Sequence, residues 1–198
     1  MFRTIALAAT IVTLSAGSAA AQQDAWQFDS AHSAAQFSVR HMMVSTVRGN
    51  FTKLTGTLQW DGKSVSAAAI EATVPVDSID TREAKRDAHL KSADFFDAAN
   101  YPTITFKSVS VEPSGPGKAK LTGDLTMHGV TKRVVFDVEG PTPILTMGGA
   151  QRVGASATTS IKRKDFGIAW SRTLDNGGLI VGDEVTITID VEAVRKIQ

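Results

Sequence analysis

Residues 184–192 read EVTITIDVE, and apolar and polar side chains alternate at every step of this stretch. The apolar side chains all share one parity: Val185, Ile187, Ile189 and Val191. A period of two places them on one face of a β-strand. The stretch therefore predicts a strand with one buried and one solvated face, which is typical of antiparallel sheets.

The same alternation recurs along most of the chain, in residues 37–43, 47–60, 68–76, 103–111, 118–127, 131–139, 151–161 and 185–191. About eight strands with short turns, no βαβ spacing and no repeat predict an all-β sandwich or up-and-down barrel. Gly49 and Gly56 inside the second run predict bulges or bends of a curling sheet. Large and small residues mix on the inner parity, which favours a barrel with room for a ligand.

Residues 81–97 interrupt this pattern with a short excursion. Its first part, TREAKRDAHL, predicts one or two helical turns, with Thr81 as N-cap and a weak apolar side formed by Ala84, Ala88 and Leu90. Phe95 and Phe96 follow between two aspartates and need an apolar environment. The excursion is either a loop anchored to its own core or a cap that closes a cavity.

The N-terminus has the pattern of a secretory signal peptide. Arg3 precedes an apolar run at residues 5–14, and three alanines end at Ala21. The apolar run is shorter than the roughly 20 residues of a membrane-spanning helix. We expect cleavage near Ala21 and one mature domain over residues 22–198, which is 198 − 21 = 177 residues.

Composition excludes some functions. The chain holds 21 basic and 20 acidic residues, and removal of Arg3 with the leader leaves 20 of each. A near-neutral surface gives no electrostatic basis for binding nucleic acid. The chain has no cysteine, so its stability must come from its core and not from disulfides.

Catalytic and metal-binding motifs are absent from the sequence. The run from Gly154 to Thr158 (GASAT) lacks the second glycine of a nucleophile elbow, and no phosphate-binding loop occurs. The four histidines are far apart and have no metal-ligand spacing. We therefore expect a protein that is not an enzyme and has no catalytic residue, metal or cofactor.

Basic residues gather in the excursion, beside Phe95 and Phe96: Arg82, Lys85, Arg86 and Lys91. They form either a solvated helix face or, if the two rings cap a cavity, a mouth suited to an anionic or strongly polar head group. A second basic cluster spans residues 162–164, and its distance from the first is not readable from sequence.

These motifs resemble the YceI-like polyisoprenoid-binding family along the whole mature chain. The matching stretches include WQFDSAHS at 26–33, FSVRHM at 37–42, RDAHLKSADFFD at 86–97, YPTITFKS at 101–108, GDLTMHGVT at 123–131, RKDFG at 163–167 and VGDEV at 181–185. The resemblance implies a lipocalin-like, eight-stranded antiparallel barrel that holds a long isoprenoid in its interior. It also implies a periplasmic location and frequent dimers, so that a homodimer is expected.

We therefore expect a periplasmic carrier of a polyprenyl phosphate or quinone, without a membrane span. The expected tunnel lining is Phe37, Val39, His41, Phe51, Phe95, Phe96, Ile104 and Phe106, and the head-group candidates are Arg82, Arg86 and His89. Two alternatives remain open: a binder of another long amphiphile, such as a fatty acid or fatty amide, and an enzyme acting on a lipid head group with His41 or His89 as general base. The aromatic pair disfavours a purely structural interaction domain.

Overall fold

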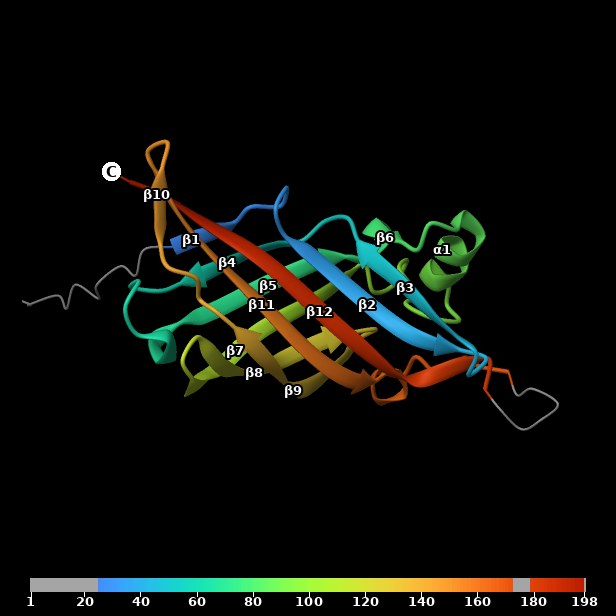
Figure 1. Cartoon of the computed structure of the whole chain (residues 1–198). Helices are drawn as coiled ribbons and strands as arrows, with labels where there is room; N and C mark the ends of the chain where they lie inside the picture. Colours follow the sequence, from blue (N-terminus) through green and yellow to red (C-terminus); the bar gives the residue numbers. More distant parts are fainter. Residues whose placement is uncertain (1–24, 173–178, 198) are drawn as a thin grey trace, which may run out of the picture.

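The computed structural model describes residues 25–172 and 179–197, which form a closed antiparallel β-barrel of eight strands with one short α-helix (Figure 1). The predicted all-β barrel with a helical excursion is confirmed. The predicted signal peptide, residues 1–21, lies outside the described residues. No helix in the described part of the chain is long and apolar enough to cross a bilayer.

Three of the eight barrel strands are each interrupted once. The segments are β1 (Ala25–Phe28), β2 (Ala34–His41), β3 (Ser45–Phe51), β4 (Thr55–Gln59), β5 (Ala69–Pro75), β6 (Ile79–Asp80), β7 (Thr103–Gly115), β8 (Lys118–Met127), β9 (Val130–Glu139), β10 (Leu145–Met147), β11 (Ala150–Lys162) and β12 (Val181–Lys196). The first barrel strand consists of β1 and β2, the second of β3 and β4, and the third of β5 and β6. β10 pairs only with β11, as a small hairpin outside the barrel.

β12 closes the barrel because both of its edges are paired. One edge runs along β11, from the pair Lys162–Glu184 to the pair Ala150–Lys196. The other edge pairs first with β2 and then with β1. The predicted strand at 185–191 is thus the middle of a strand of 16 residues, long enough to face both segments in turn.

The inward-facing side chains of β12 are only half-buried, which indicates a hollow interior. They line an internal cavity and still keep accessible surface: Val185, Ile187, Ile189 and Val191. In a close-packed core such side chains would lose nearly all of that surface. The surface that remains therefore faces the cavity.

Gly49 and Gly56 lie in regular ladders, so the prediction of bulges at these positions was wrong. Gly49 pairs with Phe37 across β2 and β3, and Gly56 pairs with Ala72 across β4 and β5. A Cβ atom on Gly49 would lie 2.5 Å from Cζ of Phe37. The missing side chain makes room for an aromatic ring. The predicted run 47–60 is instead interrupted between β3 and β4.

The excursion contains helix α1 (Ala84–Lys91), whose N-cap is Glu83 and not Thr81. The Glu83 side chain accepts a hydrogen bond from the backbone N–H of Lys85. Thr81 is buried instead, and its hydroxyl donates to Asp87 and accepts from Nε of Arg86. The predicted N-cap was wrong because this hydroxyl binds two side chains of α1 rather than the free N–H groups of its first turn.

Aromatic side chains close the two ends of the barrel. At the end near β10, Trp26 and Trp60 are buried with ring centroids 6.0 Å apart, and the guanidinium of Arg195 lies 4.4 Å above Trp26. Toward the other end, where Figure 1 shows α1, Phe95 packs against Trp170 with ring centroids 5.1 Å apart.

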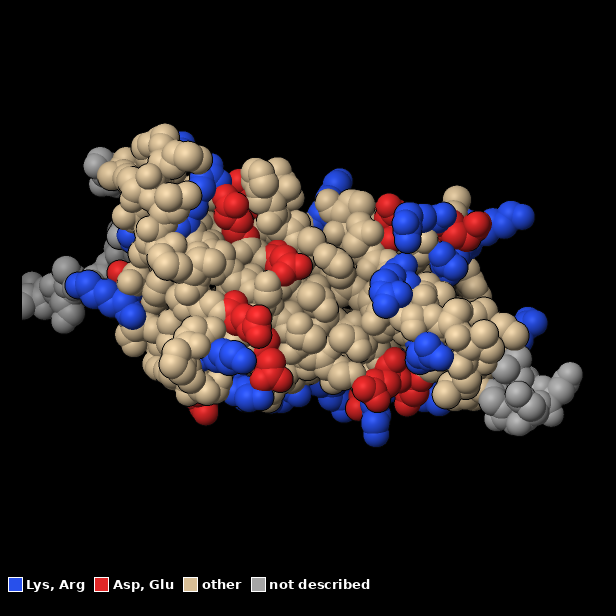
Figure 2. Space-filling model, viewed as in Figure 1, with Lys and Arg blue, Asp and Glu red and all other residues tan. Residues whose placement is uncertain are grey.

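On the outer surface, Figure 2 shows acidic and basic side chains interspersed, in keeping with their nearly equal numbers.

Candidate functional site

An internal cavity of about 310 Å³ extends along the barrel, and every barrel strand contributes to its wall. Trp60 and Val65 line it at one end, and Phe95 and Ile168 line it at the other. Cavities that hold small ligands have volumes of roughly 300–1,000 Å³. The volume is at the low end of this range, and the lining residues extend from one end of the barrel to the other, which fits a hydrocarbon chain.

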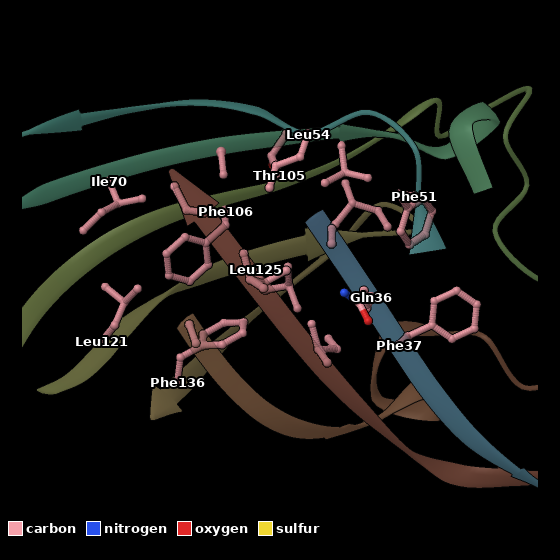
Figure 3. Close-up of a pocket in the computed structure, with 18 of the residues that line it drawn as sticks. Gln36, Phe37, Phe51, Leu54, Ile70, Thr105, Phe106, Leu121, Leu125 and Phe136 are labelled. Atoms are coloured by element: carbon pink, nitrogen blue, oxygen red, sulfur yellow. The ribbon is translucent and has the colours of Figure 1, made fainter. Parts of the chain in front are cut away.

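Phenylalanine rings make up much of this wall. Phe106 and Phe136 meet edge to face with centroids 5.5 Å apart, and Figure 3 shows both rings in the lumen near Leu121. Further along, Phe51 contacts both Phe37 and Phe96 with centroids 5.9 Å apart in each pair. Such rings offer large apolar surfaces at a small cost in side-chain entropy.

Few polar side chains belong to the wall. Among the described lining residues, only Gln36, Thr105 and Arg163 carry an amide, hydroxyl or guanidinium group. Gln36 and Thr105 are exposed on the outside of the barrel, whereas Arg163 is only 4% exposed. The described lining contains no carboxylate, histidine, lysine or serine. The cavity therefore offers an almost entirely apolar lining to a hydrocarbon chain, and Arg163 is the one buried cation in its described wall.

Comparisons with known proteins agree with this geometry. The family model described as the YceI-like domain matches residues 26–193. The chain belongs to the YceI-like family. A relative, a UPF0312 protein of Vibrio cholerae, is 40% identical over 138 residues, which cover 70% of this chain and 73% of the relative.

Solved structures share the YceI-like barrel. BcnA of Burkholderia cenocepacia has a TM-score of 0.71 at 27% identity, over 83% of this chain and 98% of BcnA. A polyisoprenoid binding domain from Saccharophagus degradans has a TM-score of 0.64 over 87% of this chain and 99% of that domain. Its identity is 14%, so this likeness shows the fold alone.

The YceI-like barrel brings together all but one of the residues expected in the tunnel. Those in the cavity wall are Phe37, Val39, Phe51, Phe95, Phe96, Ile104 and Phe106. His41 is not part of the described wall. It ends β2, where it pairs with Ser45 of β3 and Val181 of β12.

The three head-group candidates lie outside the described cavity wall. Arg82 is exposed, with a positive φ of 62°. Arg86 donates hydrogen bonds from Nε and Nη2 to the hydroxyl and the carbonyl of Thr81. Nε2 of His89 lies 2.8 Å from Oδ2 of Asp94, and its ring meets Phe95 edge to face at 5.0 Å. Arg86 thus anchors α1, and His89 covers the outside of the aromatic end.

Arg163 is the polar lining residue that sequence reasoning missed. Its neighbours Lys162 and Lys164 are exposed, as expected for a basic cluster on the surface, but Arg163 turns inward at the end of β11. The available signal was the RKDFG run at residues 163–167, which stands at the end of a strand. The fold places the start of this run at the cavity.

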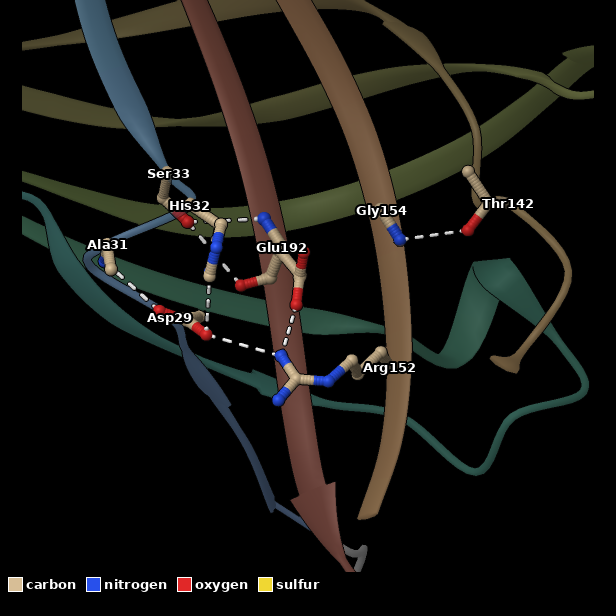
Figure 4. A network of polar contacts seen from close by, with 8 residues as sticks. All are labelled: Asp29, Ala31, His32, Ser33, Thr142, Arg152, Gly154 and Glu192. Carbon is tan, nitrogen blue, oxygen red and sulfur yellow. Dashed lines mark hydrogen bonds and ion pairs between the residues drawn. The ribbon is translucent and has the colours of Figure 1, made fainter. Parts of the chain in front are cut away.

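A second, polar hollow of about 450 Å³ lies on the outside of the barrel, over the paired strands β11 and β12. Beside it, Arg152 donates to Asp29 and Glu192, and Asp29 also faces Nδ1 of His32 at 3.0 Å (Figure 4). These contacts with His32, the N–H of Ala31 and Arg152 lower the pKa of Asp29. The ligand atoms of Asp29, His32 and Glu192 lie within 4.8 Å of one another. Because Arg152 donates hydrogen bonds to both acids, we interpret this cluster as a junction between the first barrel strand, β11 and β12.

Proposed function

We propose that this protein binds a long-chain isoprenoid lipid, of polyprenyl phosphate or quinone type, and carries it through the periplasm. The observation that carries this proposal is the apolar wall that continues from Trp60 to Ile168 inside the barrel. An isoprenoid tail is a linear chain of five-carbon apolar units, each with one methyl branch, and such a chain matches an apolar hollow that runs along the barrel.

The driving force is removal of the tail from water. Each buried CH₂ group contributes about 0.8 kcal/mol, so ten such groups contribute roughly 8 kcal/mol before the tail's ordering is counted. The wall need not form specific hydrogen bonds along the tail. Rings such as Phe51, Phe106 and Phe136 supply contact area instead.

Two further findings support the isoprenoid and the location. A domain of the same fold from Saccharophagus degradans is described as polyisoprenoid-binding. The N-terminal sequence up to Ala21 has the features of a signal peptide, and carriage between membranes fits an exported protein. The segment with Phe95 and Phe96 is the proposed gate, because both rings line the cavity beside α1.

Native mass spectrometry of protein purified from the periplasm of its own host tests this proposal. We expect a chain that begins near Gln22 with one lipid bound, and organic extraction should return an isoprenoid. A fatty acid or fatty amide would retain the apolar site and refute the isoprenoid. Protein without any lipid, or a chain that still carries Met1, would contradict the carrier role or the export.

A matched pair of variants on β7 controls this measurement. Phe106→Asp places a carboxylate in the cavity wall and should abolish lipid retention, since an unpaired charge in an apolar site is costly. Val109→Asp makes a similar change at an exposed position of the same strand and should retain the lipid. Circular dichroism must show that both variants keep their β-structure. Equal lipid content in both folded variants would exclude Phe106 from the site.

A further inference from the structure

Arg163 places a positive charge at one end of the apolar cavity. It is the first residue of a short turn (Arg163–Phe166) that follows β11, and it is 4% exposed. Three of its neighbours in the cavity wall are Ile161, Ile168 and Val181. A guanidinium does not lose its proton in a protein, so this charge is permanent.

The hydrogen-bond partners of Arg163 are all neutral backbone carbonyls. Nε donates to Gly182 at 2.9 Å, Nη1 donates to Ile168 and Trp170 at 2.7 Å each, and Nη2 donates to Val181 at 3.3 Å. A guanidinium has five N–H groups. Within the described residues, one N–H group of Nη2 therefore has no partner, and Arg163 takes part in no ion pair.

The charge of Arg163 is only partly compensated. Burial lowers the pKa of its guanidinium, while the negative charge of Asp183 raises it. Asp183 itself accepts a hydrogen bond from the backbone N–H of Lys164. Burying a cation is costly unless it is paired, and carbonyl dipoles supply a part of that pairing. A negative group inside the cavity would supply the rest.

We propose that Arg163 is the subsite for an acidic head group, and that the ligand is an apolar amphiphile ending in a phosphate or carboxylate. This inference rests on the proposed function and narrows it, since it favours a polyprenyl phosphate over a neutral quinone. The head group accepts a hydrogen bond from the free N–H of Nη2, and the tail extends along the cavity toward Trp60. A hydrogen bond between two charged groups is stronger than one between neutral groups, and more so away from water.

A purely structural role for Arg163 makes a different prediction. Its carbonyl partners lie on two segments, Ile168 and Trp170 on one and Val181 and Gly182 on the other. An arginine that only ties these segments together would support the binding of acidic and neutral ligands equally. The ratio of two affinities therefore separates the two roles, whereas a loss of affinity for one ligand does not.

Farnesyl phosphate and farnesol share a tail and differ in charge, so we would measure the affinity of both for wild type and variants. In Arg163→Met the ratio of farnesol Kd to farnesyl phosphate Kd should fall about tenfold or more, because one charged hydrogen bond is lost. Arg163→Lys keeps the charge and should retain part of the ratio. Arg133→Gln removes a cation that pairs with Asp124 on the outer surface and should leave the ratio unchanged. Equal losses for both ligands in Arg163→Met would overturn the proposal.

A second measurement needs no variant and remains decisive if Arg163→Met does not fold. Farnesoic acid, isotope-labelled at its carboxyl carbon, is bound to the wild-type protein and titrated by NMR. A nearby cation lowers the pKa of a carboxylic acid, whereas burial among apolar groups raises it. Other titratable groups near Arg163 are Lys164 and Asp165 in its own turn, Asp183, His128 and His89. Nδ1 of His128 lies 3.1 Å from the carbonyl of Phe166, and the ring of His89 contacts that of Trp170. We expect the bound acid to have a lower pKa than the free acid, and a higher pKa would overturn the proposal.

The outcomes distinguish this inference from the proposed function. Suppose that farnesol binds to the wild-type protein, but that Arg163→Met leaves the affinity ratio unchanged and the bound acid has a raised pKa. Only the proposal of an acidic subsite then fails. If neither farnesyl ligand binds to the wild-type protein, the proposed isoprenoid function fails. Palmitate and its alcohol serve as a straight-chain pair. The same Arg163-dependent ratio with this pair, but no farnesyl binding, would retain the acidic subsite for a fatty acid.

Discussion

Gly123 shows how a single residue shapes the lumen of this barrel. It lies in β8, paired with Ser108 of β7, and a Cβ atom there would lie 2.2 Å from Cζ of Phe106 and 2.7 Å from the carbonyl oxygen of Lys107. The ring of Phe106 can turn into the cavity only because Gly123 has no side chain. Its packing against Phe136 depends on the same space.

Gly123→Ala should therefore lower the free energy of unfolding by about 1–3 kcal/mol, because the added methyl forces the Phe106 ring or the backbone to move. Chemical denaturation would measure this loss. Gly154→Ala is the matched control, since the nearest atom to its added Cβ, in Thr142, is 3.5 Å away. That change should leave stability unchanged or raise it slightly. Equal stability of the two variants would contradict the steric role of Gly123.

Single residues also mark where sequence reasoning ends. The alternating pattern placed Phe37, Ile104 and Phe106 on the inner face, because a period of two needs no tertiary information. Arg163 could not be recognised in this way, since four backbone carbonyls, of residues 168, 170, 181 and 182, hold its side chain inward, and a pattern of side chains does not predict where carbonyls point. The same holds for Gly49, whose space is filled by a ring from the neighbouring strand.

At the scale of elements, α1 and the segment that follows it behave as one cap. The backbone N–H of Phe96 donates to the carbonyl of Leu90, and the N–H of Ala98 donates to the carbonyl of Lys91. These bonds hold the segment against the C-terminal end of the helix. Leu90, Phe95 and Phe96 of this cap line the cavity. A helix of eight residues with a weak apolar side gains its stability from such packing more than from its own sequence.

Phe96→Ala should speed release of a bound lipid, because the cap loses much of a ring that buries about 150–250 Å². Transfer of a fluorescent prenyl analogue to acceptor vesicles would measure the rate. Phe166→Ala is the control, since Phe166 belongs to the same apolar cluster but lies outside the described cavity wall. It should lower Tm without faster release from the folded protein. Unchanged release in Phe96→Ala would favour a loop that is anchored to its own core and does not act as a gate.

Element boundaries were less predictable than the elements themselves. The excursion was recognised because its period differs from that of the strands, but its helix begins after Glu83. Both Thr81 and Glu83 can cap a helix, and the choice depended on the contacts of Thr81 with Arg86 and Asp87. Local sequence does not contain that information, because it requires the burial of Thr81 beside β3, where its methyl group faces Gly49.

At the scale of the whole molecule, the barrel leaves its centre unfilled and so forgoes part of the stability of a packed core. The alternation along the chain predicted the number and kind of strands. It could not predict closure, which requires β12 to pair with β11 on one edge and with two successive segments on the other. A ligand that fills the hollow binds only the closed barrel, and its binding free energy therefore adds to the stability of the fold.

A bound prenyl lipid should accordingly raise Tm, and a side chain that occupies the hollow should prevent this rise. At a lipid concentration of about 100 times Kd, the gain is roughly 2.7 kcal/mol, or about 5–10 °C for a domain of this size. Ala157 of β11 lines the cavity, whereas its neighbour Thr158 is exposed on the outside. Ala157→Phe should leave the Tm of the lipid-free protein unchanged or raise it, and should abolish most of the lipid-induced rise in Tm. Thr158→Phe should retain the full lipid-induced rise. A full rise in both variants, measured by calorimetry, would mean that the lipid binds outside the barrel.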